Sequence, residues 1–286
     1  PTAFEFAVRN PGGIPPGLRS QFNNRGHESL DRIGPIKPVR SPAPLILHAG
    51  CVHTMHTKRN IPDIPAGGVA IVWAKPGQLS RTVISRSNQK VTFKVPSFKT
   101  GKMLYAESSI ECSFYRRIDT DPEVEKVVPQ PAILYYLDAG ITRRHFPDCL
   151  VVRSTPARTF VEIKSASDPK LAEAYRRAEL LIPGLLKQGY GYEVITSAEI
   201  RAKPYFDNAR TLLRLGRKPV GAMEAESIRQ SILQRPQTTW RDILHGALGA
   251  KAPFHVARLI LDGVLIFDSS KLLGASTVIA PLPSTL

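Results

Sequence analysis

Two short apolar segments, CLVV at 149–152 and FVEI at 160–163, are joined by a turn rich in Ser, Thr, Pro and Arg. Apolar runs separated by a short polar turn are typical of a β-hairpin. The next segment has helical spacing, with Asp168 as its candidate N-cap and Pro169 at the first helical position. GYEVITS at 191–197 then predicts another strand. A hairpin followed by a helix and a strand predicts a mixed α/β domain, which restricts the fold more than any other feature of the chain.

The segments around the hairpin extend this pattern. MLYAESSIECSFYRRID at 103–119 has roughly helical spacing of its apolar side chains, and a DP pair ends it. Residues 124–140 predict strands that are interrupted by the QP pair at 130–131. In the helix after the hairpin, the PG pair at 183–184 is expected to cause a kink or a split. The order helix–strand–strand–strand–helix–strand indicates one compact α/β domain.

The N-terminal part of the chain has a different character. Residues 1–45 contain PGGIPPG, RIGPIKPVR and SPAP, which break any regular period and predict extended segments. Short β-like runs between 46 and 100 predict a small β-rich element. We therefore expect residues 1–87 to form a Pro-rich basic arm with a short β-rich element, followed by the α/β domain at 88–205.

The C-terminal part, 206–286, predicts a small winged-helix domain. Two apolar segments after the third helix, VLIFD and STVIAP, could pair as a β-ribbon, and three helices followed by a ribbon are the winged-helix pattern. Trp240 and Phe254 are expected to anchor its core, and His245 and His255 to have packing or surface roles. The three expected helices are AMEAESIRQSIL (222–233), TTWRDILHGAL (238–248) and FHVARLILDG (254–263).

The net charge of the chain is +15, which makes a polyanion, and nucleic acid above all, the natural partner. Residues 1–100 hold 14 basic and 4 acidic residues, so +10 of this charge lies there. The three cysteines are too few and too scattered for a disulfide framework, and a reducing cytoplasm suits them best. No apolar run approaches the roughly 20 residues needed to span a bilayer, so we expect no membrane partner.

The predicted hairpin carries a set of residues suited to phosphodiester hydrolysis. Asp148 precedes one strand, and Glu162 and Lys164 lie two residues apart on the other, so they share a face while Ile163 turns into the core. Carboxylates are the ligands that Mg²⁺ prefers, and Mn²⁺ is expected to substitute for it. A lysine beside the metal could orient water or stabilise the transition state. The alternative is that these are surface carboxylates and a solvated lysine on a hairpin edge.

Other patterns in the chain are weaker candidates. The pair Pro62-Asp63 is not followed by an apolar strand, and the D-x-K pattern at 168–170 begins a helix. A cluster in HAGCVHTMH could hold zinc, but one short stretch rarely supplies a complete zinc site. A polar loop is therefore the preferred interpretation of that cluster, which contains His48, Cys51, His53 and His56.

Several motifs in order resemble the TnsA family, whose members are restriction-endonuclease-like subunits of heteromeric cut-and-paste transposases. The motifs are ES-x-x-E, DP-x-V, QP, PD and E-x-K, within KVTFKVPSFKTGKMLYAESSIECSFYRRIDTDPEVEKVVPQP, HFPDCLVV and TFVEIKS. The resemblance extends over residues 88–200, and the winged-helix pattern at 220–282 is similar to the C-terminal domain of the family. It implies a restriction-endonuclease-like mixed sheet flanked by helices.

The resemblance also implies roles for individual residues. Glu111 of SSIE matches the helix-borne catalytic glutamate of the family, although Glu107, four residues earlier, shares its helix face and is an alternative. Asp148 matches the metal-binding aspartate, and Glu162 and Lys164 match the second metal-site position and the catalytic lysine. The backbone carbonyl of Ile163 is a further metal ligand. We also expect Gln130 to lie near the site, and Cys149, where the family often has Phe, to have a packing role.

The function implied by this resemblance is metal-dependent cleavage of DNA at the 5′ ends of a mobile element. The implied partners are the transposon ends, a DDE-type transposase that cuts and joins the 3′ ends, and an AAA+ ATPase regulator. One alternative is a stand-alone restriction or repair-type nuclease with the same site. Another is a catalytically inert protein that binds DNA or assembles a complex.

Overall fold

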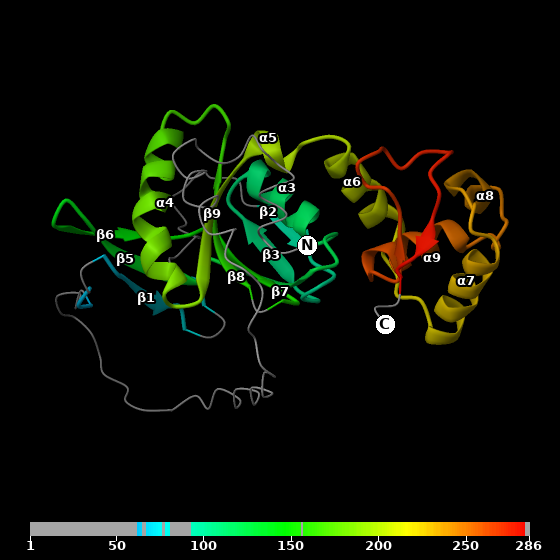
Figure 1. Ribbon diagram of the computed structural model, residues 1–286, viewed down its shortest axis with the longest axis horizontal. Coiled ribbons are helices and arrows are strands. Elements are labelled where there is room, and N and C mark those ends of the chain that lie inside the picture. Colours follow the sequence, from blue (N-terminus) through cyan, green and yellow to red (C-terminus); the bar gives the residue numbers. More distant parts are fainter. Residues whose placement is uncertain (1–61, 65–66, 76–77, 81–92, 156, 284–286) are drawn as a thin grey trace, which may run out of the picture. The chain divides into compact units, whose positions relative to one another are not determined.

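The computed structural model describes residues 62–64, 67–75, 78–80, 93–155 and 157–283, and Figure 1 shows how its helices and strands are arranged. The arm predicted at 1–45 and the His and Cys cluster of HAGCVHTMH lie outside the described residues. The described part is a mixed α/β protein with several sheets and seven helices. None of these seven helices is both long and apolar enough to cross a membrane.

The central sheet has four strands in the order β4-β7-β8-β9. β7 pairs antiparallel with β4 and with β8, whereas β9 lies parallel to β8. A parallel pair needs a crossover connection, and α4 (Leu171–Leu186) provides it. The predicted hairpin, helix and following strand are thus confirmed. The four strands are β4 (Val124–Pro129), β7 (Cys149–Arg153), β8 (Arg158–Lys164) and β9 (Tyr190–Thr196).

A second, antiparallel sheet has the order β1-β5-β6. Its strands are β1 (Val69–Trp73), β5 (Ala132–Asp138) and β6 (Ile141–His145). β5 follows β4 after the QP pair, where the sequence indicated an interruption. β1 pairs with β5 along its full length, from Val69 opposite Tyr136 to Trp73 opposite Ala132. The boundary drawn from the sequence at residue 88 therefore separates β1 from the sheet to which it is hydrogen-bonded.

The helix α4 runs without a break through Pro183 and Gly184, where the sequence predicted a kink or a split. A Cβ atom on Gly184 would lie 2.8 Å from the backbone nitrogen of Val69, so glycine allows β1 to approach the helix closely. Gln188 secures the same contact, because its Nε2 donates a hydrogen bond of 2.7 Å to the carbonyl of Val69. The Pro-Gly pair is therefore a packing feature of a continuous helix.

Two other local predictions are wrong. The segment predicted as helix from 103 begins with strand β3 (Met103–Ala106), which pairs with β2 (Phe93–Pro96) and buries every second side chain. The helix itself, α3, extends only over Ser109–Ile118. Asp168 is not the N-cap of α4; its carboxylate accepts the N–H of Lys170 at 2.8 Å in the turn before the helix.

The two faces of the central sheet pack into different cores. One face packs against α3 and the β2–β3 hairpin, and α5 (Ser197–Ile200) covers its end. The other face packs against α4 and the second sheet. Cys149 is fully buried in the first core, which confirms its predicted packing role. The largest fully buried side chains of the second core are Leu134, Phe160, Leu181 and Leu185.

The residues from 205 onward form helices with a core of their own. The three predicted helices and the paired ribbon are present, and the sequence missed only α6, whose Leu212 packs into this core. Trp240 is buried as predicted, but Phe254 is 52% exposed, so its predicted role as a core anchor is wrong. The elements are α6 (Tyr205–Leu215), α7 (Ala222–Gln234), α8 (Trp240–Leu244), α9 (Ala252–Leu261), β10 (Leu265–Ile266) and β11 (Ala280–Pro281).

Candidate functional site

Asp148 lies directly before β7 and is held by three hydrogen bonds, two to β8 and one to the residue that follows β4. Its N–H donates to the carbonyl of Val161 at 3.0 Å, and its own carbonyl accepts the N–H of Gln130 at 2.9 Å. Its side-chain Oδ2 accepts the N–H of Ile163 at 2.6 Å. The carboxylate is thereby brought to the segment that contains Glu162 and Lys164, as the predicted hairpin requires.

The surroundings of Asp148 disfavour its charge. Its pKa is raised to about 7, mainly by burial and also by the neighbouring carboxylates of Glu111 and Glu162, while the hydrogen bond from the N–H of Ile163 acts in the opposite direction. Lys164 opposes this shift only weakly. A carboxylate held near others in a half-buried position gains stability when a cation arrives, because the cation offsets both the repulsion and the lost hydration.

Glu162 and Lys164 share one face of β8, and Ile163 is 8% exposed in the opposite core, so the predicted alternation is confirmed. The Nζ of Lys164 lies 3.1 Å from Oε1 of Glu162. In an antiparallel pair, one residue directs both its N–H and its C=O to the same neighbour. Since the N–H of Ile163 donates to Asp148, we expect its carbonyl to face the same side of β8 as Asp148.

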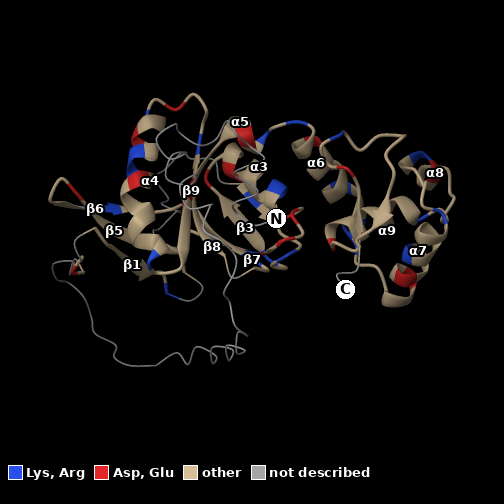
Figure 2. Ribbon diagram, viewed as in Figure 1, with Lys and Arg blue, Asp and Glu red and all other residues tan. Residues whose placement is uncertain are grey.

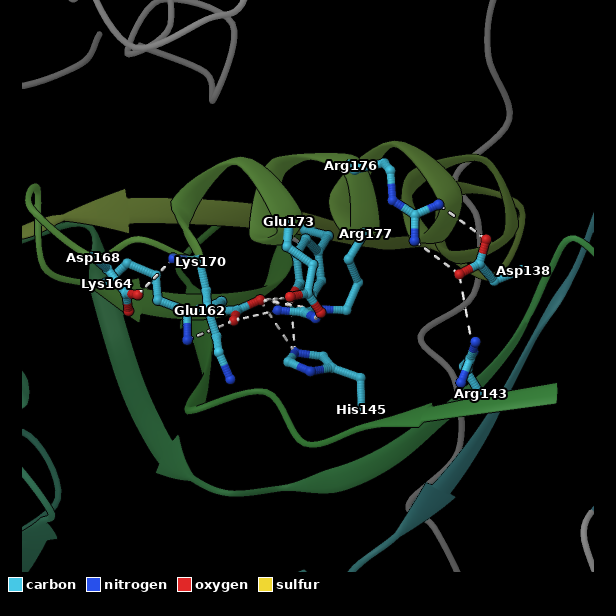
Figure 3. A network of polar contacts seen from close by, with 11 residues as sticks. Asp138, Arg143, His145, Glu162, Lys164, Asp168, Lys170, Glu173, Arg176 and Arg177 are labelled. Carbon is cyan, nitrogen blue, oxygen red and sulfur yellow. Dashed lines mark hydrogen bonds and ion pairs between the residues drawn. The ribbon is translucent and has the colours of Figure 1, made fainter. Parts of the chain in front are cut away.

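Glu162 is 2% exposed and is the centre of a polar cluster that the sequence analysis missed (Figure 3). Arg177 of α4 donates to both of its oxygens, from Nη2 at 2.7 Å and from Nε at 3.3 Å. The hydroxyl of Tyr192 on β9 donates at 2.7 Å, and Nε2 of His145 on β6 lies 3.4 Å away. Tyr192 lies on the strand parallel to β8, but no motif in the sequence links these three residues to Glu162.

The surroundings of Glu162 shift its pKa in the opposite direction from that of Asp148. Burial alone raises the pKa of a carboxyl group, but the nearby His145 and the hydrogen bonds from Arg177 and Tyr192 outweigh it. The result is a pKa of about 2. A carboxylate has about four acceptor positions, and the donors of the cluster occupy them. A metal ion could bind Glu162 only by displacing one of these donors.

The two glutamates of α3 and its preceding turn have separate contacts. Glu111 belongs to the N-terminal cap of α3: its Oε1 accepts from the hydroxyl of Ser108 at 3.0 Å, and its Oε2 accepts the N–H of Glu107 at 2.9 Å. Glu111 also lies near enough to Asp148 to raise the pKa of that carboxyl group. The carboxylate of Glu107 accepts a hydrogen bond from Gln130. Glu107 and Glu111, the two alternatives for the helix-borne glutamate, therefore both lie on the Asp148 side of the site.

Gln130 lies between these groups in an uncommon conformation. Its φ is 41°, a left-handed value that non-glycine residues rarely adopt. Its side chain is buried, and Nε2 donates to Glu107. Among the described residues, Oε1 of Gln130 is a buried acceptor without a hydrogen-bond donor. An oxygen of this kind is suited to a cation or to a water bound to one.

The donor set on the Asp148 side fits a hard divalent cation. Its possible ligands are oxygens of Asp148, Glu111, Gln130 and the Ile163 carbonyl, and Mg²⁺ typically takes one or two carboxylates with waters and substrate phosphate. Within the described ranges, no group of three or more His, Cys, Asp or Glu side chains could hold a metal ion. Any site would thus depend on carbonyl, amide and water oxygens in addition to the two carboxylates.

No protein-family model matches the chain, and no curated protein matches it either. The case for a function therefore rests on the geometry of Asp148, Glu162 and Lys164, together with the motifs in the sequence.

Proposed function

We propose that the chain is a metal-dependent DNA endonuclease that cleaves the 5′ ends of a mobile element, as the subunit of a TnsA-type transposase. The observation that carries the proposal is the hydrogen bond from the N–H of Ile163 to Asp148. It joins the aspartate of the PD motif to the E-x-K segment across β7 and β8. The order of the elements also agrees with a restriction-endonuclease-like core: a helix is followed by three antiparallel strands, a crossover helix and a parallel strand.

The residues that would hold Mg²⁺ or Mn²⁺ are Asp148, Glu111 and the carbonyl of Ile163, with Gln130 near them. When bound, such an ion activates water and neutralises charge on the phosphate. Asp148 is the main ligand, because its backbone is locked to both neighbouring strands and its Oδ2 is oriented by the N–H of Ile163. Glu162 lies beside this group as the acceptor for Lys164.

Lys164 is the residue that acts on the substrate. Its side chain is 25% exposed, and its ammonium is held at 3.1 Å from Glu162, at the end of β8 nearest Asp148. In that position it orients the attacked phosphate and stabilises the additional negative charge of the pentavalent transition state. It cannot ligate a metal, since an ammonium has no lone pair.

Charge supports DNA as the substrate. The net charge of +15 favours a polyanion. Figure 2 shows Lys and Arg on β6, and both basic and acidic residues on α4. The winged-helix pattern of the C-terminal part supports a role in docking the DDE-type transposase or the AAA+ ATPase regulator. None of the proposed catalytic residues lies in that part.

The proposal is tested with supercoiled DNA that carries the ends of the element, incubated with the chain, its neighbour-encoded transposase and Mg²⁺ or Mn²⁺. We expect cleavage at the 5′ ends, no cleavage in chelator, and loss of cleavage with Asp148→Ala while DNA binding persists. Cleavage without any partner would favour a stand-alone nuclease. DNA binding without cleavage under all conditions would favour an inert assembly protein.

A further inference from the structure

We propose that Arg177 is a positioning residue: it fixes the carboxylate of Glu162 and, through Glu162, orients the ammonium of Lys164. The inference rests on the proposed nuclease function and adds a residue outside the sequence motifs. It also implies that Glu162 serves as an acceptor for these two cations and is not a metal ligand.

The contact between Arg177 and Glu162 is a two-point one. Nη2 donates to Oε1 at 2.7 Å, and Nε donates to Oε2 at 3.3 Å. The guanidinium is a planar fork, so two such bonds fix the plane of the carboxylate as well as its position. The side chains of Arg177 and Glu162 are 15% and 3% exposed, which limits competition from water.

One oxygen of Glu162 links Arg177 to Lys164. Oε1 accepts both the Nη2 of Arg177 and the Nζ of Lys164, which lies 3.1 Å away. Rotation of this carboxylate would therefore move the partner of the ammonium. Lysine is a flexible point charge that does not orient itself. The direction of Lys164 consequently depends on the carboxylate, and the direction of the carboxylate depends on Arg177.

The second oxygen of Glu162 is held from other elements. Tyr192 on β9 donates its hydroxyl proton to Oε2 at 2.7 Å, so its oxygen can accept a hydrogen bond from Nε2 of His145, 2.8 Å away. Helix α4, β9 and β6 thus converge on one carboxylate. By contrast, the described hydrogen bond to the Asp148 carboxylate comes from a backbone N–H. Because side chains from three elements hold Glu162, we assign Glu162 and Arg177 to positioning Lys164 and not to metal binding.

The preceding residue of α4 offers a matched control. Arg176 also makes a two-point contact with a carboxylate, through bonds of 2.9 Å and 2.8 Å to Asp138. Its side chain, however, is 57% exposed, and its carboxylate partner lies at the end of β5, away from Lys164 (Figure 3). Loss of Arg176 removes the same charge and the same type of contact without touching Glu162.

The experiment compares Arg177→Met, Arg176→Met, Lys164→Met and the double variant of Arg177 and Lys164 in the cleavage assay. We expect Arg177→Met to lower kcat by about a hundredfold, as for a misplaced catalytic group. KM and the affinity for Mn²⁺ should change by less than about threefold, and Arg176→Met should stay within about twofold of wild type. With Lys164→Met already present, Arg177→Met should lower kcat by less than about threefold more, because the two act as one unit.

Two results would overturn the inference. One is a full, multiplicative loss of kcat in the double variant, since Arg177 would then act independently of Lys164. The other is a large loss of Mn²⁺ affinity in Arg177→Met or Glu162→Gln, which would make Glu162 part of the metal site. Should Arg177→Met fail to fold, Arg177→Lys keeps the charge without the fork, and an unchanged kcat in that variant contradicts the proposal.

Failure of the proposed function has a different signature. If the wild-type chain cleaves no DNA with its partners, the nuclease proposal is wrong, and thermal unfolding in chelator still tests the cluster. There, Glu162→Gln combined with Arg177→Met should lower Tm by clearly less than the two single losses added together. Additive losses would show that Arg177 does not fix Glu162.

Discussion

Asp148, directly before β7, and Glu162, on β8, belong to one site, yet their surroundings are opposite. Burial and neighbouring carboxylates raise the pKa of Asp148 to about 7 despite the hydrogen bond from a backbone N–H. Glu162 is also buried, but His145, Arg177 and Tyr192 lower its pKa to about 2. Surroundings that shift the pKa values of two carboxyl groups in opposite directions give the two groups different chemical roles. Among the described residues, no side-chain cation is hydrogen-bonded to Asp148, and Lys164 lowers its pKa only weakly, so this side is suited to a metal ion. The Glu162 side already contains Arg177 and Lys164.

The largest effect that sharpens this comparison is expected from Glu162→Met. Removing one partner of a buried ion pair leaves buried positive charge uncompensated, which lowers the free energy of unfolding by about 3–5 kcal/mol. The measurement is urea unfolding in chelator at neutral pH. Because the folded pKa of Glu162 is lowered, its contribution to stability is complete above the ordinary glutamate pKa of 4.5 and is lost as the pH falls toward 2.

The control for that variant is Asp138→Ala. Its side chain is 16% exposed but its partner Arg176 is 57% exposed, so water reaches the pair and the loss should be much smaller. Equal losses of unfolding free energy in the two variants would mean that burial adds nothing to the Glu162 contacts, which would contradict the comparison.

The next effect has the opposite sign. Without metal, Asp148→Asn should raise the free energy of unfolding at pH 8, by at most about 4 kcal/mol, because each pKa unit corresponds to 1.36 kcal/mol. The folded pKa of about 7 lies above the ordinary aspartate pKa of 3.8, so the wild type loses stability as the pH rises from 4 to 7. The gain of the variant should therefore shrink toward pH 4. Unfolding curves at pH 4 to 8 in chelator test this, and a gain that does not depend on pH would contradict it.

A smaller effect tests whether the Asp148 side and the Glu162 side both depend on the packing of α4 against β1. Gly184→Ala places a Cβ 2.8 Å from the backbone of β1, and such overpacking lowers stability by about 1–3 kcal/mol. It should also loosen α4, which carries Arg177, and lower kcat while Mn²⁺ affinity persists. Gly221→Ala is the control, since a Cβ there meets no atom within 4 Å. Loss of metal binding in Gly184→Ala would mean that the Asp148 side also depends on α4.

The smallest effect distinguishes the two glutamates near Asp148. The amide oxygen of Gln can still accept the N–H of Glu107, and its NH2 can donate to the hydroxyl oxygen of Ser108, so Glu111→Gln removes the charge but should preserve α3. It should lower Mn²⁺ affinity by about tenfold, while Glu107→Gln changes it much less. Isothermal titration of both variants provides the measurement. The reverse order would assign the helix-side ligand to Glu107.

Much of the fold could be predicted from local patterns. Strand alternation placed Glu162 and Lys164 on one face and Ile163 in the core, and the helix–hairpin–helix–strand order implied a mixed sheet. The prediction failed where a local pattern was ambiguous. Residues 103–106 carry apolar side chains that suit both periods, and only their pairing with β2 decides for a strand. Glycine is a helix breaker when only the local sequence is considered. In the folded protein, Gly184 is the residue that lets β1 approach α4 closely.

The candidate site divides in the same way. The sequence alone determined which strands carry Asp148, Glu162 and Lys164, because period-two alternation and the hairpin turn are local properties. Only the tertiary structure decided that Glu162 is saturated by cations and Asp148 is not. Arg177, Tyr192 and His145 come from a helix and two strands that meet Glu162 through the crossover and the second sheet. The charge state of a buried carboxylate depends on such distant neighbours and on the water that they exclude, and neither is encoded in the residues next to it.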